Sequence, residues 1–111
     1  MVTLDTHNID NLSAWLNALL RAKKERIKLK GIKSHRSFHN ALVASSDRAR
    51  TYYVMVDTRK DTPVAYCTCL SGHHDKVCKH AALVMDSLPD YQFDQHLLNS
   101  IIAGSAPQEA A

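Results

Sequence analysis

Three cysteines and one histidine are the side chains of this chain whose spacing is most suited to chemistry. Cys67 and Cys69 are separated by one residue, eight residues follow, and Cys78 is separated from His80 by one residue. An odd number of cysteines argues against a closed set of disulfides. In a reducing compartment, clustered Cys and His are more often metal ligands than disulfide partners. A chain this short buries only a modest core, so a metal would be a useful staple.

The elements that position these side chains follow from the spacing. Residues i and i+2 of a strand point to the same face, so a strand would present the sulfurs of Cys67 and Cys69 side by side. Within a helix the same offset points in nearly opposite directions. We therefore expect Cys78 just before a first helical turn and His80 within it. The loop between the pairs contains the turn signal Ser71-Gly72 and can bring them together. Three thiolates and one imidazole then form a closed tetrahedral site for one structural zinc ion.

Other interpretations of the cluster are weaker. Buried reduced cysteines without a metal would leave the offset of His80 a coincidence. A catalytic Cys–His pair would need an orienting group and an oxyanion site, and a catalytic zinc would need an open position. His73 and His74 could replace a ligand or bind a second ion weakly, although solvated loop residues are the more common case. With no paired carboxylates, phosphate-cradling glycine loop or nucleophile elbow, we expect no enzyme.

The pattern Cys67-x-Cys69-x₈-Cys78-x-His80 resembles the SWIM zinc-finger family. The strand residues Tyr52-Tyr53-Val54 and the apolar helix after Cys78 are also similar to that family, and the resemblance covers roughly residues 40–88. It implies a strand-strand-helix zinc site, with DNA binding or protein–protein contacts as the activity. Family members occur in chromatin-remodelling ATPases, transposases and ubiquitin ligases. The 111 residues contain no such catalytic domain, so the larger activities of those family members are not expected of them.

Helical periodicity predicts an amphipathic helix that begins near Ile9, is capped by Asn8 or Asp10, and fades by about Lys28. Its apolar stripe is expected to be buried and comprises Ile9, Leu12, Trp15, Leu16, Leu19 and Leu20. Residues 27–30 then alternate, and they could form either a last helical turn or a first edge strand.

Three strands are predicted over residues 37–45, 51–57 and 64–69, joined by short connections as an antiparallel meander. A helix follows Cys78 and ends at Pro89. A last short helix would end at Gly104. The core candidates are Leu42, Val54, Val56, Leu83 and Val84.

The predicted fold class is α+β. It is a small zinc-stapled domain with an antiparallel β-meander followed by a helix, and with flanking N- and C-terminal helices. Residues 1–36 comprise the N-terminal amphipathic helix and a basic segment, 37–88 the SWIM-like zinc-binding ββα core, 89–104 the C-terminal helix, and 105–111 a disordered tail.

The charge distribution is uneven: residues 1–20 carry a net −2, residues 21–60 carry +9 and residues 61–111 carry −4. A basic block is either a polyanion footprint or a solvated helix end. The candidate phosphate-contacting residues are Lys23, Lys24, Arg26, Lys28, Lys30, Lys33, Arg36, Arg48 and Arg50.

Two functions are compatible with these features. The first is a nucleic-acid-binding module, for DNA before RNA and with low sequence specificity, because no base-reading helix is evident. The second is a protein-interaction adaptor, in which the N- or C-terminal helix docks on a partner or on a second copy. Without a secretory signal or an apolar run of bilayer length, an intracellular location, cytoplasmic or nuclear, is expected and a membrane is not.

Overall fold

A computed structural model describes residues 1–45, 47, 49–70 and 76–89. Its elements are β1 (Val2–Thr3), α1 (Ile9–Lys24), β2 (Lys28–His35), β3 (Phe38–Ala44), β4 (Thr51–Asp57), β5 (Val64–Cys67) and α3 (Lys79–Ser87). The described part is therefore an α+β fold, as predicted. The predicted C-terminal helix and tail lie outside the described residues.

The five strands form one antiparallel sheet in the order β1-β5-β4-β3-β2. The predicted meander is confirmed, and it has one strand more than expected because residues 28–35 pair with β3. This pairing decides the question left open for residues 27–30: residues 28–30 begin β2, and Ile27 directly precedes it. The two-residue strand β1 adds to the other edge by pairing with β5, and no sequence pattern had predicted it.

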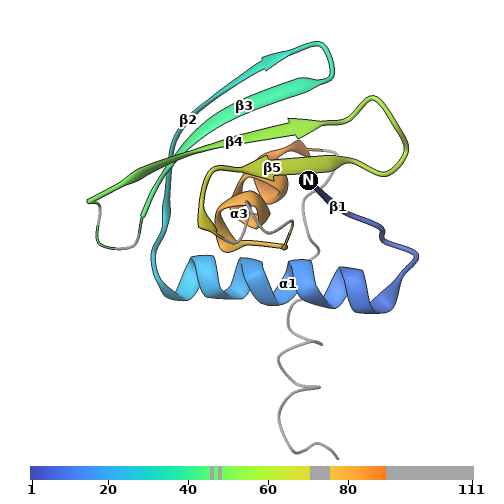
Figure 1. Ribbon diagram of the computed structural model, residues 1–111, viewed down its shortest axis with the longest axis horizontal. Coiled ribbons are helices and arrows are strands. Elements are labelled where there is room, and N and C mark those ends of the chain that lie inside the picture. The colour runs from blue at the N-terminus through green and yellow to red at the C-terminus, as the bar shows by residue number, and fades with distance from the viewer. Residues whose placement is uncertain (46, 48, 71–75, 90–111) are drawn as a thin grey trace, which may run out of the picture.

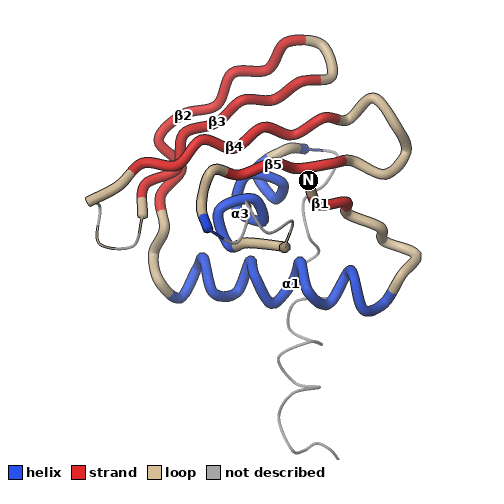
Figure 2. Tube along the Cα trace, in the orientation of Figure 1, coloured by secondary structure: helices blue, strands red, loops and turns tan. Residues whose placement is uncertain are grey.

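Both described helices lie on one side of the sheet (Figures 1 and 2). α3 packs directly against β4 and β5, and α1 packs against α3. The order of layers is therefore sheet, α3, α1, which places α3 at the centre. The hairpin of β2 and β3 lies at the opposite edge of the sheet from β1 and extends past the helices (Figure 1).

The core forms where these layers meet. Trp15, Leu16 and Leu19 of α1 are fully buried, as are Val54 and Val56 of β4 and Val84 and Met85 of α3. The indole N–H of Trp15 donates to the carbonyl oxygen of Thr3 at 3.0 Å, which ties α1 to β1.

Two core expectations are wrong. Leu42 is 48% exposed, because Ala41 and Val43, its neighbours in β3, take the inward positions. Ile9 is 76% exposed, because it is the first residue of α1 and precedes the part of the helix that α3 covers. The N-cap expectation is confirmed: the side chain of Asn8 accepts a hydrogen bond from the backbone N–H of Asn11 at 3.0 Å.

Arg26 and Arg36 adopt positive φ angles of 56°, and they are the two non-glycine residues that do so among those described. Arg26 ends α1: its N–H donates to the carbonyl of Lys23, and the N–H of Ile27 donates to that of Ala22. This is the Schellman pattern, which usually has glycine at that position. Arg36 begins the two-residue turn between β2 and β3, where glycine is again the usual residue.

Candidate metal centre

Cys67 and Cys69 come from the end of β5. Cys67 is the last residue of the strand and pairs with Val54. The ladder continues through Thr68, whose N–H donates to the carbonyl of Tyr53 and whose hydroxyl accepts from the N–H of Tyr53. Both cysteines are buried and Thr68 is exposed, as strand alternation predicted.

Cys78 and His80 come from the start of α3. Cys78 is the N-cap, with extended backbone angles of φ −121° and ψ 158°. Its sulfur accepts a hydrogen bond from the backbone N–H of Ala81 at 3.3 Å. His80 lies in the first turn, and both residues are buried. The predicted arrangement, with Cys78 before the first turn and His80 within it, is confirmed.

The structure brings the four predicted ligands together. The ligand atoms of Cys67, Cys69, Cys78 and His80 all lie within 4.8 Å of one another. Ligands of a tetrahedral ion with bonds of about 2.3 Å are about 3.8 Å apart, so side-chain shifts on the order of 1 Å close the site. None of the three cysteines is in a disulfide.

The environment of His80 bears on whether a metal fits. Its Nδ1 atom is buried and has no hydrogen-bond partner within the described part of the chain. A buried polar atom without a partner is costly, and nearly all such atoms are paired. A metal ion held by these residues would be compatible with that environment. The donor set of three sulfurs and one imidazole suits a single structural ion such as zinc.

Of the cluster's thiols, Cys78 is the one held toward its thiolate form. The pKa of Cys78 is lowered to about 4, chiefly because the Cys67 thiol donates a hydrogen bond to its thiolate, with further hydrogen bonds from His80 and from the N–H of Ala81. The pKa of Cys67 is raised, because its proton makes that hydrogen bond and because the thiol is buried. A position at a helix N-terminus also favours a thiolate. Metal binding would then displace the proton of Cys67.

Two neighbours hold the ligand segment in place. The ring of Tyr52 packs on the imidazole of His80, with centroids 4.4 Å apart and planes tilted by 40°. Lys79, between two ligands, forms an ion pair with Glu25 at 2.5 Å. Sequence reasoning had treated Tyr52 as a strand residue without linking it to His80. It had no signal at all for the Lys79–Glu25 pair. His73 and His74 lie outside the described residues.

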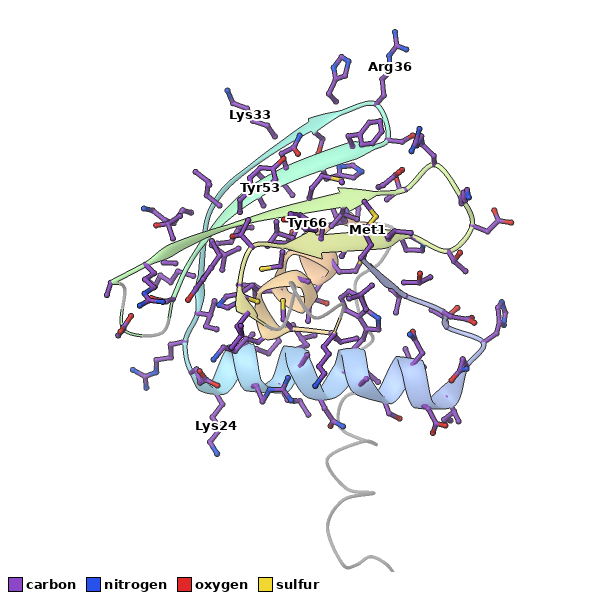
Figure 3. The ribbon with its side chains drawn as sticks, viewed as in Figure 1. Met1, Lys24, Lys33, Arg36, Tyr53 and Tyr66 are labelled. Carbon is purple, nitrogen blue, oxygen red and sulfur yellow. The ribbon has the colours of Figure 1, made fainter. Side chains whose placement is uncertain are left out.

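The basic candidates are spread over two parts of the molecule. Lys23, Lys24 and Arg26 lie at the end of α1, where Lys24 points away from the sheet (Figure 3). Lys28, Lys30 and Lys33 lie on β2, and Lys33 points away on the side opposite α1. Arg36 lies at the tip of the β2–β3 hairpin and Arg50 directly precedes β4. These eight residues are exposed, and Arg48 lies outside the described residues.

Ion pairs join Arg59 to Asp57 and Lys79 to Glu25. Neither involves a basic candidate.

No family model, curated protein or solved structure matches the chain. Among the described helices, none has the length and apolar character needed to cross a membrane. What the fold and site define is therefore a class: a small α+β protein with a buried Cys₃His cluster that could bind a metal.

Proposed function

We propose that this protein is a zinc-stapled, non-enzymatic module of the SWIM type that binds nucleic acid with low sequence specificity, as an accessory factor. The observation that carries the proposal is the row of exposed lysines on β2, Lys28, Lys30 and Lys33, none of which is in an ion pair recorded among the described residues. Lysine and arginine contacts to phosphate supply most of the affinity of non-specific binding.

The backbone supports this assignment independently. Arg26 and Arg36 bracket β2, and each occupies a left-handed position at which a side chain costs on the order of 1 kcal/mol relative to glycine. Such strain is worth explaining by function when it is observed. A need for guanidinium groups at both ends of the lysine row explains why arginine stands there.

The zinc site has a supporting role in this proposal. Four protein ligands leave no open position for water, which favours a structural ion over a catalytic one. The metal would fix β5 to α3, and α3 supports the sheet that carries the lysines. No step of chemistry is assigned to it.

A protein-interaction adaptor is the second candidate. The structure leaves less exposed apolar surface on α1 than the sequence suggested. α3 covers the part of the stripe that contains Trp15, Leu16 and Leu19, which are fully buried, and Ile9 stays exposed. The C-terminal helix expected to offer a second stripe lies outside the described residues.

Fluorescence anisotropy with labelled DNA at several salt concentrations tests the proposal. With about three to five phosphates engaged, the log–log plot of affinity against salt should have a slope of roughly −3 to −5 on duplex DNA. Changing Lys28, Lys30 and Lys33 together to Glu should abolish binding and leave the zinc content unchanged. The comparison variant changes Lys23 and Lys24 on α1 to Glu, and it should weaken binding less, because these two candidates lie apart from the β2 row. Affinity weaker than the ~10⁻⁴–10⁻⁶ M of ordinary non-specific binding would overturn the proposal.

A further inference from the structure

The sheet has one face that no described residue covers. α3 packs on the face that carries Val54 and Val56. Alternation places Leu42, Tyr53, Met55 and Tyr66 on the opposite face, which we call the open face. Leu42 is 48% and Tyr53 is 40% exposed, and the two are directly paired across β3 and β4.

The open face contains a shallow groove beside Tyr53. Its volume is 470 Å³, and its lining includes Gly31, Lys33, Asn40, Leu42 and Tyr53. A Cβ atom placed on Gly31 would meet no atom within 4 Å, so the packing of the protein does not require glycine there. The hydroxyl of Tyr53 donates to the Oδ1 atom of Asn40, which holds the ring over the sheet.

The groove is bordered by positive charge. Lys33 lines it directly. Lys30 reaches across β3 on the same face, and its Nζ atom lies 3.4 Å from the hydroxyl of Thr51. No carboxylate lines the groove, and Asp57, which shares this face of β4, is paired with Arg59. An apolar aromatic centre with a lysine border is complementary to a ligand that has both flat rings and negative charges.

We propose that the open face binds single-stranded nucleic acid, with Tyr53 stacking on a base and the β2 lysines holding the adjacent phosphates. This inference rests on the proposed function and names its ligand. Single strands expose the faces of their bases, and aromatic side chains on sheets serve as their stacking platforms. In a duplex the bases are stacked on one another, so the ring of Tyr53 would have no base face to meet.

Tyr66 provides a second platform at a suitable place. It is paired with Met55, two residues along β4 from Tyr53, so the two tyrosines are diagonal neighbours. Diagonal neighbours are about 7–8 Å apart across antiparallel strands. Two successive bases of an extended strand could therefore rest on Tyr53 and Tyr66 as the strand crosses the open face, with the phosphates on the Tyr53 side meeting the β2 lysines.

The test compares a labelled single-stranded oligothymidine with a duplex of the same length, by anisotropy on the full zinc-loaded chain. We expect the single strand to bind more tightly. Tyr53→Ala should weaken its binding about 5- to 150-fold, which is the usual contribution of one stacked base. Tyr53→Phe keeps the ring and should stay within about threefold of the original protein. Zinc content and the far-UV spectrum verify that each variant is folded.

Gly31→Val provides a variant whose loss of binding could not come from poor folding. Valine suits a strand better than glycine, and its Cβ atom would meet no atom within 4 Å, so the variant should be at least as stable. Its side chain would project into the groove and should weaken single-strand binding, while duplex binding is unchanged.

Three outcomes distinguish the possibilities. Loss on Tyr53→Ala and Gly31→Val, with retention on Tyr53→Phe, supports the inference. If the duplex binds as tightly as the single strand and neither change matters, the inference is wrong while the proposed function stands. If neither nucleic acid binds, both are overturned and a protein ligand for the open face becomes the better account.

Discussion

The Nζ atom of Lys79 lies 2.5 Å from the Oε1 atom of Glu25, and this ion pair joins the first residue of α3 to the C-cap of α1. Lys79 stands between Cys78 and His80. The two residues are 54 positions apart in the chain, so the pair fixes the end of α1 against the segment that carries two of the four candidate metal ligands.

The pair should be visible in the titration of Glu25. The ammonium of Lys79 holds the pKa of the Glu25 carboxyl below its usual value of 4.5. Its stabilising contribution is thus fully present above pH 4.5 and is lost as the pH falls through the lowered pKa. Carbon-detected NMR should show this lowered pKa. Lys79→Met should return it toward 4.5, and an unchanged value in that variant would show that the ion pair does not form in solution.

Metal removal should cost a large part of the folding free energy. Small zinc modules gain on the order of 10–16 kcal/mol from their ion at neutral pH. We expect one zinc per chain by elemental analysis, and loss of structure over residues 64–88 on chelation. Cys69→Ser should have a similar effect, whereas Thr68→Ser, at the exposed position between two ligands, should retain the ion. A far-UV spectrum that survives chelation intact would contradict a structural role.

Replacing either of the two arginines with positive φ by glycine should raise the stability of the fold. Arg26→Gly and Arg36→Gly should each stabilise the fold by about 1 kcal/mol, because glycine adopts the left-handed region without strain. For a domain of this size that is a rise in Tm of about 4–8 °C. Arg21→Gly, inside α1, is the matched control and should lower stability by about 1 kcal/mol. Thermal denaturation of the three variants measures both signs. Equal destabilisation by all three would mean that the arginine positions are not strained.

Truncating a buried side chain of α3 should cost more stability than truncating a side chain on the open face of the sheet. Met85 is fully buried in α3, and Met85→Ala should cost about 2–5 kcal/mol of unfolding free energy. Leu42 is half-exposed on the open face, so Leu42→Ala should lower the unfolding free energy by less than about 1 kcal/mol, as changes at surface positions usually do. Urea denaturation compares them. A large loss at Leu42 would indicate that something covers the open face in solution.

The metal cluster was predictable because its geometry is local. The i, i+2 rule for strands and the position of a helix N-cap fix where Cys67, Cys69, Cys78 and His80 point without reference to the rest of the chain. The helix after Cys78 could be predicted equally well, since the period of its apolar residues is clear and Pro89 ends it.

The register of β3 was not predictable with the same certainty. Residues 41–44 are all apolar, so the alternation that identifies the inner face is missing there. A shift of one residue exchanges the two faces of a strand. The structure places Ala41 and Val43 inside, so that Leu42, the larger side chain, lies outside.

β1 and β2 depend on tertiary contacts that the sequence does not reveal locally. β1 has two residues and exists because β5 offers it an edge. β2 is rich in exposed lysine and contains Gly31, which gives no strand signal. Its pairing with β3 decides its conformation, and the bulge between Leu29 and Gly31 further obscures the period.

The order of the elements along the chain has a consequence for synthesis on the ribosome. All four ligands fall between positions 67 and 80, so the metal-binding segment closes only a short loop and can assemble as soon as it emerges. α1 is made long before, yet its apolar stripe is covered by α3, which is made last among the described elements. A nascent chain that stalls before position 79 would therefore display Trp15, Leu16 and Leu19 to the cell, as a target for chaperones and proteases.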